Sequence, residues 1–173
     1  MLFRSAGPVY RFSPTAMYQA GFSAVALGLG RAMLNSFVAL ANVKTPSGAG
    51  LMLRDNPIIQ NRVAISTARL AAMHAWLKQS VGESWNGCVA SGKHAFEHRV
   101  TMRLAATYAI HEAAKVVEDA YADAGATAIF ECNPFERRLR DINAVSQQVQ
   151  ANFAHLQSVG RYYLGMKPGL RFI

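Results

Sequence analysis

Few residue spacings in this chain could support chemistry, and the clearest is a pair of histidines. His94 and His98 are four residues apart, a spacing that can place two imidazoles on one helical face and hold a metal ion. No third ligand follows at a suitable spacing, and a di-iron bundle would need Glu-x-x-His pairs on two helices. We therefore predict no metal site and interpret both histidines as surface residues at the basic start of a helix.

Two further motifs match known sites only in part. Gly28-Leu29-Gly30 could open a phosphate-binding loop, but a dinucleotide fingerprint needs a strand before the glycines and a helix after them. The glycines lie inside an apolar run, which favours close helix packing. The sequence contains no Gly-x-Ser-x-Gly elbow for serine catalysis. Cys88 and Cys132 lack metal or redox spacing, which is typical of a reduced, cytoplasmic protein.

The net charge of +8 would suit an anionic partner. Candidate nucleic-acid patches are Arg99 with Arg103, or Arg137 with Arg138 and Arg140. However, the aromatic residues fall on apolar stripes and not among these arginines. We interpret the arginines as solvated faces or interhelical ion pairs, and predict no nucleic-acid partner.

The elements that must position these residues are four helical segments. Each repeats apolar residues at intervals of three and four, and no segment alternates as a strand would. Breaker sequences separate them, such as Thr45 to Gly50 and Gly82 to Gly92. Long helices with shorter connections predict an all-α fold, a long antiparallel four-helix bundle over residues 13–173. The helices are expected at about 14–43, 56–82, 93–124 and 134–164.

Capping residues predict where these helices begin and end. Ser13 can cap the first helix, and Asn133 the fourth, with Pro134 in its first turn and Glu136 three residues after the cap. Gly125 is a natural stop for the third helix.

The first helix is the most apolar. From Phe22 to Leu40 it is apolar nearly all round, more than one antiparallel bundle can bury on one stripe, which predicts self-association. The longest uncharged run, Phe12 to Gly30, is interrupted by polar residues, a proline and glycines. We therefore expect no membrane span and a soluble protein.

The last third of the chain resembles a known family. Asn133-Pro134-Phe135-Glu136-Arg137 and Leu139-Arg140-Asp141-Ile142, after the small-residue turn from Gly125 to Phe130, are similar to the signature joining the last two bundle helices of the acyl-CoA dehydrogenase-like flavoenzymes. The sequence from Leu27 to Ala32 resembles the first bundle helix of that family, and Asn56 to Gln60 the start of its second. These motifs resemble those of the aromatic and sulfur-heterocycle monooxygenases more closely, because the Glu-Gly-Thr segment of true acyl-CoA dehydrogenases is absent.

This resemblance implies the C-terminal domain of a flavin-dependent oxidoreductase or monooxygenase. Residues 1–12, which include Gly7-Pro8-Val9-Tyr10-Arg11, would be the strand-like lead-in from a missing β-domain. The domain would form a cytoplasmic homo-oligomer, a dimer or tetramer, and supply part of a site for FAD or FMN and a small-molecule substrate. The isolated chain is expected to be inactive and to bind no flavin alone. The alternative is a self-associating, non-catalytic bundle that lacks the catalytic domains.

The resemblance also implies particular site residues. Arg54 and Gln60, with Gly125, Ala126 and Thr127 at the turn, would approach the flavin phosphates, since a cation and a helix N-terminus suit that anion. Alternatively, Arg54 is solvated and Gln60 caps a helix.

One departure from the family concerns mechanism. The monooxygenase branch has a histidine on the fourth helix, about two turns after the Arg-Asp pair, that faces the flavin and substrate. That position falls at Gln148 here, with Gln147 as the near alternative. Glutamine can donate and accept hydrogen bonds but takes up no proton near neutral pH, so an orienting role is implied. The other interpretation is a glutamine that faces solvent or a neighbouring helix.

Overall fold

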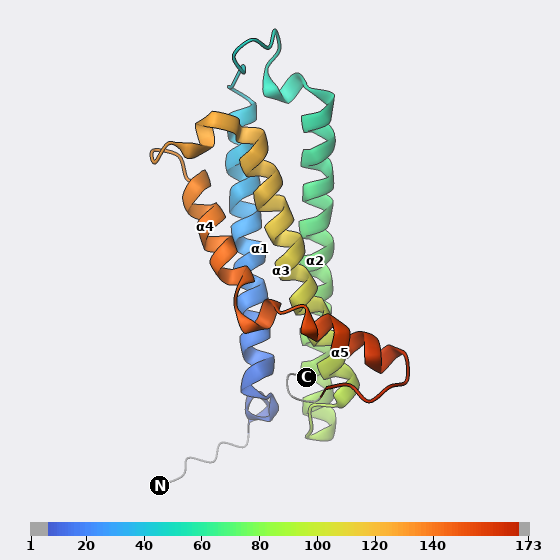
Figure 1. The fold of residues 1–173 in the computed structure, drawn as a ribbon. Helices are drawn as coiled ribbons and strands as arrows, with labels where there is room; N and C mark the ends of the chain where they lie inside the picture. Colours follow the sequence, from blue (N-terminus) through green and yellow to red (C-terminus); the bar gives the residue numbers. More distant parts are fainter. Residues whose placement is uncertain (1–6, 170–173) are drawn as a thin grey trace.

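The computed structural model describes residues 7–169, and these residues are helical apart from their connections. Figure 1 shows α1 to α4 running alternately up and down, with the short α5 across the lower end. No strand occurs in the described range, which confirms the all-α prediction. The helices are α1 (Pro14–Ala41), α2 (Pro57–Ser91), α3 (Phe96–Ala124), α4 (Phe135–Ser146) and α5 (Ala154–Tyr163).

Helix α3 is the centre of the bundle and contacts each of the other four helices. Its inner positions are mostly alanine and valine, with Ala106, Ala109 and Ala113 fully buried. Small side chains allow neighbouring helix backbones to approach closely, so α3 can be covered on several sides at once. Phe37 from α1 and Ile142 from α4 complete the same core.

Of the predicted N-caps, Ser13 is confirmed and Asn133 is wrong, and Asn56 is a further cap that was not predicted. Ser13 Oγ accepts a hydrogen bond from the Ala16 amide at 3.1 Å, and Asn56 Oδ1 accepts one from Ile58 at 2.9 Å. Asn133 does not cap α4, because its side-chain amide donates to the Thr127 carbonyl at 3.0 Å and Pro134 is the N-cap residue. Asn133 therefore fixes the preceding turn instead of the helix start.

The predicted break at Gly82 to Gly92 is too long, since α2 continues to Ser91 and ends at Gly92, whose φ of 75° is left-handed. Gly87 lies inside α2, and the His98 side chain of α3 packs against it. A Cβ at Gly87 would lie 2.7 Å from that imidazole. The glycine therefore admits a neighbouring side chain and does not end the helix.

The predicted fourth helix, 134–164, is two helices. α4 ends at Ser146 and α5 begins at Ala154, and a short 3-10 turn, η4 (Val149–Ala151), lies between them. We call residues 147–153 the α4–α5 connection. Val149 and Phe153 of this connection are exposed because the chain leaves the helical path there.

The predicted close packing is confirmed at Gly30 of α1. A Cβ on Gly30 would lie 2.9 Å from Leu70 Cδ2 and 3.5 Å from Ala113 Cβ, so this glycine lets α1, α2 and α3 meet. A Cβ on Gly28 would meet only open space, which contradicts the packing prediction there, and the same is true of Gly21.

The interrupted run at the start of the chain is a continuous helix. By length and composition, α1 is long and apolar enough to cross a membrane, because an 18-residue window within it has a mean hydropathy of 1.5. Core helices of soluble proteins pass the same test, and Met33 and Phe37 of α1 are buried against the bundle. The polar residues thus do not break the run as expected.

The predicted strand-like lead-in is a 3-10 turn, η1 (Pro8–Arg11), and residues 1–6 lie outside the described range. Arg11 Nη1 donates to the Cys88 carbonyl near the end of α2 at 2.9 Å. The Phe12 ring lies 4.7 Å from that of His94 and 6.3 Å from that of Trp85. These contacts attach the lead-in to the lower end of the bundle.

Candidate functional site

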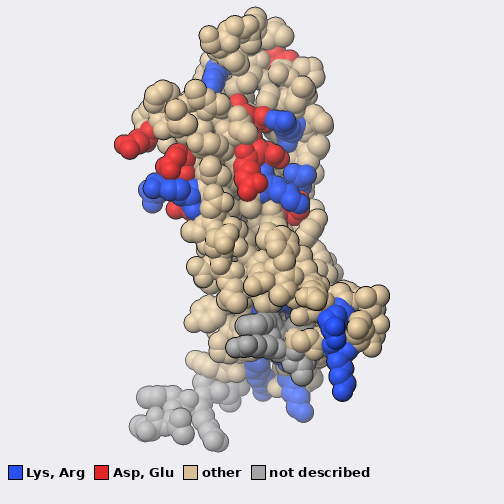
Figure 2. Space-filling model, viewed as in Figure 1, with Lys and Arg blue, Asp and Glu red and all other residues tan. Residues whose placement is uncertain are grey.

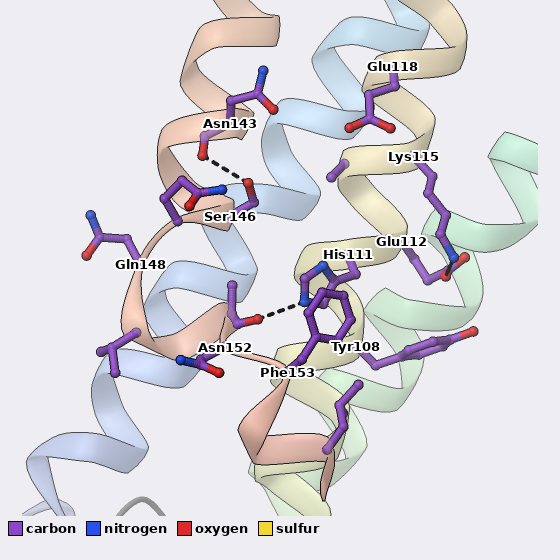
Figure 3. Close-up of a pocket in the computed structure, with 15 residues that line it drawn as sticks. Tyr108, His111, Glu112, Lys115, Glu118, Asn143, Ser146, Gln148, Asn152 and Phe153 are labelled. Carbon is purple, nitrogen blue, oxygen red and sulfur yellow. Dashed lines mark hydrogen bonds and ion pairs between the residues drawn. The ribbon is translucent and has the colours of Figure 1, made fainter.

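An open pocket of about 640 Å³ lies between α3 and the α4–α5 connection. Figure 3 shows α3 forming one wall and the end of α4 with the connection forming the other. The predicted site residue Gln148 and its alternative Gln147 both line it. The other polar and aromatic lining residues are Tyr108, His111, Glu112, Lys115, Glu118, Asn143, Ser146, Asn152 and Phe153.

An aromatic pair forms the floor of this pocket. The His111 imidazole stacks on the Phe153 ring with centroids 4.1 Å apart and planes 15° from parallel. His111 Nε2 donates to the Ala151 carbonyl at 2.7 Å, so the imidazole is held by the connection on which Phe153 lies. A flat, apolar surface of this kind can stack against an aromatic ring.

The α3 wall carries an ion pair. Lys115 Nζ lies 2.6 Å from Glu112 Oε1, and this hydrogen bond holds the pKa of the lysine above its ordinary value. Arg69 of α2 contacts the other oxygen of Glu112 at 3.3 Å. The two cations compensate the charge of Glu112. Because this side chain is also only 5% exposed, its carboxylate is not available to a ligand.

The opposite wall is neutral. Gln147, Gln148, Asn143 and Asn152 offer amide donors and acceptors, and none of these groups exchanges a proton near neutral pH. Gln148 is exposed and lies in the connection, not on a helix as implied for the family position. Figure 3 shows its amide extending away from His111, at the margin of the pocket.

Arg54 and Gln60 lie together at the other end of the bundle. Gln60 Nε2 donates to the Arg54 carbonyl at 2.9 Å, and both residues line a pocket of about 280 Å³ beside the start of α2. Arg54 is exposed and has one weak ionic contact, to Asp55 at 3.8 Å. Its guanidinium therefore remains available to an anion.

The turn of Gly125, Ala126 and Thr127 belongs to a 3-10 segment, η3 (Gly125–Ile129), that follows α3 directly. Lys44 Nζ donates to the Ala124 carbonyl at 2.6 Å, which places a second cation next to this turn. The Leu53 amide donates to the Lys44 carbonyl at 2.9 Å, which connects the turn to the segment that carries Arg54. The sequence reasoning missed Lys44.

The histidine pair is half-buried and not on the surface, so that interpretation was wrong. Both ring nitrogens of His94 are buried and have no hydrogen-bond partner among residues 7–169. Burial, then the nearby Arg99 and His98, lowers the pKa of His94 to about 4. His94 precedes α3, so the pair does not share a helical face. Within residues 7–169, no three potential metal ligands lie together.

Arg137 and Arg140 of α4 lie on a solvated face, as predicted, but their ion pairs form within α4 and not between helices. Arg137 pairs with Asp141 and Arg140 with Glu136, each one helical turn apart. Arg138 donates to the Ala32 carbonyl and so attaches α4 to α1. Figure 2 shows acidic and basic side chains interleaved on the upper half of this face, whereas the charged side chains visible at its lower end are basic.

One arginine was interpreted wrongly. Arg103 is 1% exposed, so it belongs neither to a solvated face nor to a nucleic-acid patch. Its Nη1 donates to Gln150 Oε1 in the connection at 2.6 Å. The signal in the sequence was the spacing of Arg103, Thr107 and His111, three polar residues four apart on a helix that is otherwise rich in alanine.

Comparison with known proteins bears on this arrangement. The family model described as acyl-CoA dehydrogenase, C-terminal domain, matches residues 20–153. An indole-3-acetate monooxygenase from Acinetobacter baumannii is 31% identical over 161 residues, which cover 93% of this chain and 41% of that enzyme. The chain thus spans about two fifths of the length of this relative.

Solved structures share the fold. A 3-HSA hydroxylase from Rhodococcus sp. RHA1 superposes with a TM-score of 0.87 at 20% identity, covering 98% of this chain and 44% of that one. XiaF from Streptomyces sp., solved in complex with FADH2 and glycerol, gives 0.88 at 16% identity, covering 96% and 43%.

Proposed function

The chain belongs to the family of acyl-CoA dehydrogenase C-terminal domains, and on that premise we propose that it serves a flavin-dependent monooxygenase. The observation that carries this proposal is the pocket between α3 and the α4–α5 connection, which contains both Gln147 and Gln148. The likeness to an indole-3-acetate monooxygenase favours the monooxygenase branch.

In this proposal the pocket contributes one side of the substrate site. The stacked His111 and Phe153 rings offer an apolar surface to an aromatic ring, and Gln148 orients the substrate or flavin by hydrogen bonds. A bound reduced flavin would supply the electrons for oxygen activation. The chain's own residues would bind and orient, since the amides of the connection cannot transfer protons near neutral pH.

The flavin phosphates would lie at the other end of the bundle. Arg54 is exposed beside the N-terminus of α2, and Lys44 lies next to the turn of Gly125, Ala126 and Thr127. Cationic side chains and a helix N-terminus both favour a phosphate. These residues lie at the other end of the bundle from the pocket of Gln148, and in the proposed oligomer one flavin would contact the two sites on different copies of the chain. The proposed assembly is a homo-oligomer, in the cytoplasm, that takes FAD or FMN.

The second candidate is a self-associating bundle without catalysis. The exposed apolar side chains Met17, Tyr18, Val25 and Val38 on α1 favour association in either case. The two candidates differ in whether the Arg54 and Gln148 regions bind a flavin once the remaining domains are supplied.

A hybrid enzyme tests the proposal. This chain replaces the matched C-terminal two fifths of the Acinetobacter baumannii indole-3-acetate monooxygenase, and the purified hybrid is examined for mass and flavin affinity. We expect an oligomer that binds reduced flavin, and weaker binding when Arg54 is changed to Gln. A folded, oligomeric hybrid without flavin affinity would instead support the non-catalytic bundle.

A further inference from the structure

The α4–α5 connection is held to the bundle by side chains that bind three successive backbone carbonyls. His155 Nε2 donates to the Val149 carbonyl at 2.6 Å, Thr107 Oγ1 to that of Gln150 at 3.0 Å, and His111 Nε2 to that of Ala151 at 2.7 Å. We call Thr107, His111 and His155 the turn-binding residues. A carbonyl oxygen only accepts, so both imidazoles must carry a hydrogen on Nε2.

This arrangement replaces regular secondary structure. Within η4 the backbone contributes the bonds from Ala151 to Gln148 and from Asn152 to Val149, at 2.9 and 3.2 Å. Gln150 and Ala151 are buried, so carbonyls left without donors would be costly. The turn-binding residues supply these donors from α3 and α5.

Arg103 adds a fourth contact from the same face of α3. It lies one helical turn before Thr107 and two before His111, and its guanidinium binds the Gln150 side chain. Within the described part of the chain, no carboxylate lies within ion-pair distance of it. Its Nε is buried without a partner, and burial lowers the pKa of Arg103 to about 10.

A buried cation that contacts a neutral amide is a poor way to gain stability, because desolvation of the charge is expensive. The contact is nevertheless geometrically specific, since Gln150 then has its side chain bound by Arg103 and its carbonyl by Thr107. Residues on both sides of Gln150, from Gln147 to Phe153, form one wall of the 640 Å³ pocket.

We propose that Arg103 and Thr107 are positioning residues that act through Gln150 to fix the α4–α5 connection, and with it the pocket wall that carries Gln147 and Gln148. The inference that this wall faces a substrate rests on the proposed function. The inference that these side chains fix the wall rests on their hydrogen bonds alone.

The first test uses the 173-residue chain and needs no flavin. Thr107→Val keeps the shape of the side chain and removes its hydroxyl, while Thr107→Ser keeps the hydroxyl. Backbone amide hydrogen exchange is measured for residues 148–152 and, as the internal reference, for α2. We expect Thr107→Val to raise exchange in the connection about tenfold or more with α2 unchanged, and Thr107→Ser to restore it. Equal exchange in Thr107→Val and the unaltered chain would overturn the proposal.

A second measurement needs no variant and therefore still applies if Thr107→Val fails to fold. Nitrogen NMR of the unaltered chain reports which ring nitrogen of His111 and His155 carries the hydrogen. Both should be protonated on Nε2 at neutral pH. A hydrogen on Nδ1 alone in either ring would remove that donor and contradict the arrangement.

The same variants in the hybrid enzyme separate this proposal from the proposed function. Thr107→Val should lower kcat/KM about tenfold and Thr107→Ser should restore it. If exchange rises in the connection but turnover does not change, the wall is fixed as proposed and the assignment of the pocket to the substrate is wrong.

Discussion

Replacing His94 with Phe should flatten the dependence of stability on pH. The imidazole lies half-buried against Phe12, and both ring nitrogens are shielded from solvent and have no hydrogen-bond partner in the described part of the chain. Burial and the neighbouring Arg99 and His98 lower the pKa of His94 from about 6.5 to about 4. Among the residues that the structure describes, a proton on this ring would have no acceptor.

The sign follows from the two protonation states. Between pH 6.5 and pH 4 the unfolded chain binds a proton at His94 and the folded chain does not, so stability falls as pH falls through this window. A shift of this size amounts to at most about 2–3 kcal/mol between pH 7.5 and 4.5, and solvent screening of the half-buried ring reduces this value. Above pH 7.5 the contribution is complete and does not change.

Urea unfolding followed by circular dichroism at several pH values measures this effect. The free energy of unfolding of His94→Phe should fall by up to about 2–3 kcal/mol less than that of the unaltered chain between pH 7.5 and 4.5. His94→Gln, which is polar but does not titrate, should show the same flattening and thus controls for polarity. Parallel curves for His94→Phe and the unaltered chain would refute a buried, neutral His94.

Four further outcomes are expected. Gly28→Ala should stabilise the chain by up to about 1 kcal/mol because its position is open, whereas Gly30→Val should cost about 1–3 kcal/mol against Leu70 and Ala113; equal effects in thermal unfolding would contradict the packing. Light scattering should give a dimer or tetramer, because apolar side chains of α1 are exposed, and a strict monomer at high concentration would exclude self-association. Flavin titration should show weak or no binding to the chain alone, and stoichiometric flavin on the purified chain would mean that the bundle holds a complete site. Gln148→His in the hybrid enzyme should change the pH profile of turnover, because it adds a group that titrates near neutral pH; an unchanged profile would place Gln148 outside the site.

The sequence predicted the helices because their signals are local. Apolar spacing, the caps at Ser13 and Asn56 and the stop at Gly125 all act within one or two turns. The break in the predicted fourth helix was missed because its cause is tertiary. Residues 147–153 leave the helical path where Thr107, His111 and Arg103, some forty residues away, supply the hydrogen bonds.

The residues of the candidate site also divide into those that a local motif predicts and those that depend on tertiary packing. Gln147 and Gln148 were found by counting from a motif, and they line a pocket. His111, Phe153 and Lys44 were missed because their roles depend on which helices are neighbours. Arg103 was predicted to be a surface charge because burial of an arginine without an acidic partner is uncommon, although its spacing with Thr107 and His111 places three polar residues on one face of α3.

We propose that this chain supplies the C-terminal domain of a flavin-dependent monooxygenase. The most direct test of this claim is oxygen consumption by the hybrid enzyme with reduced flavin, measured with and without indole-3-acetate, together with assay of the oxygenated product. We predict product formation that depends on the aromatic acid and falls when Arg54 is changed to Gln. A hybrid that binds reduced flavin and the aromatic acid but forms no product would contradict the claim.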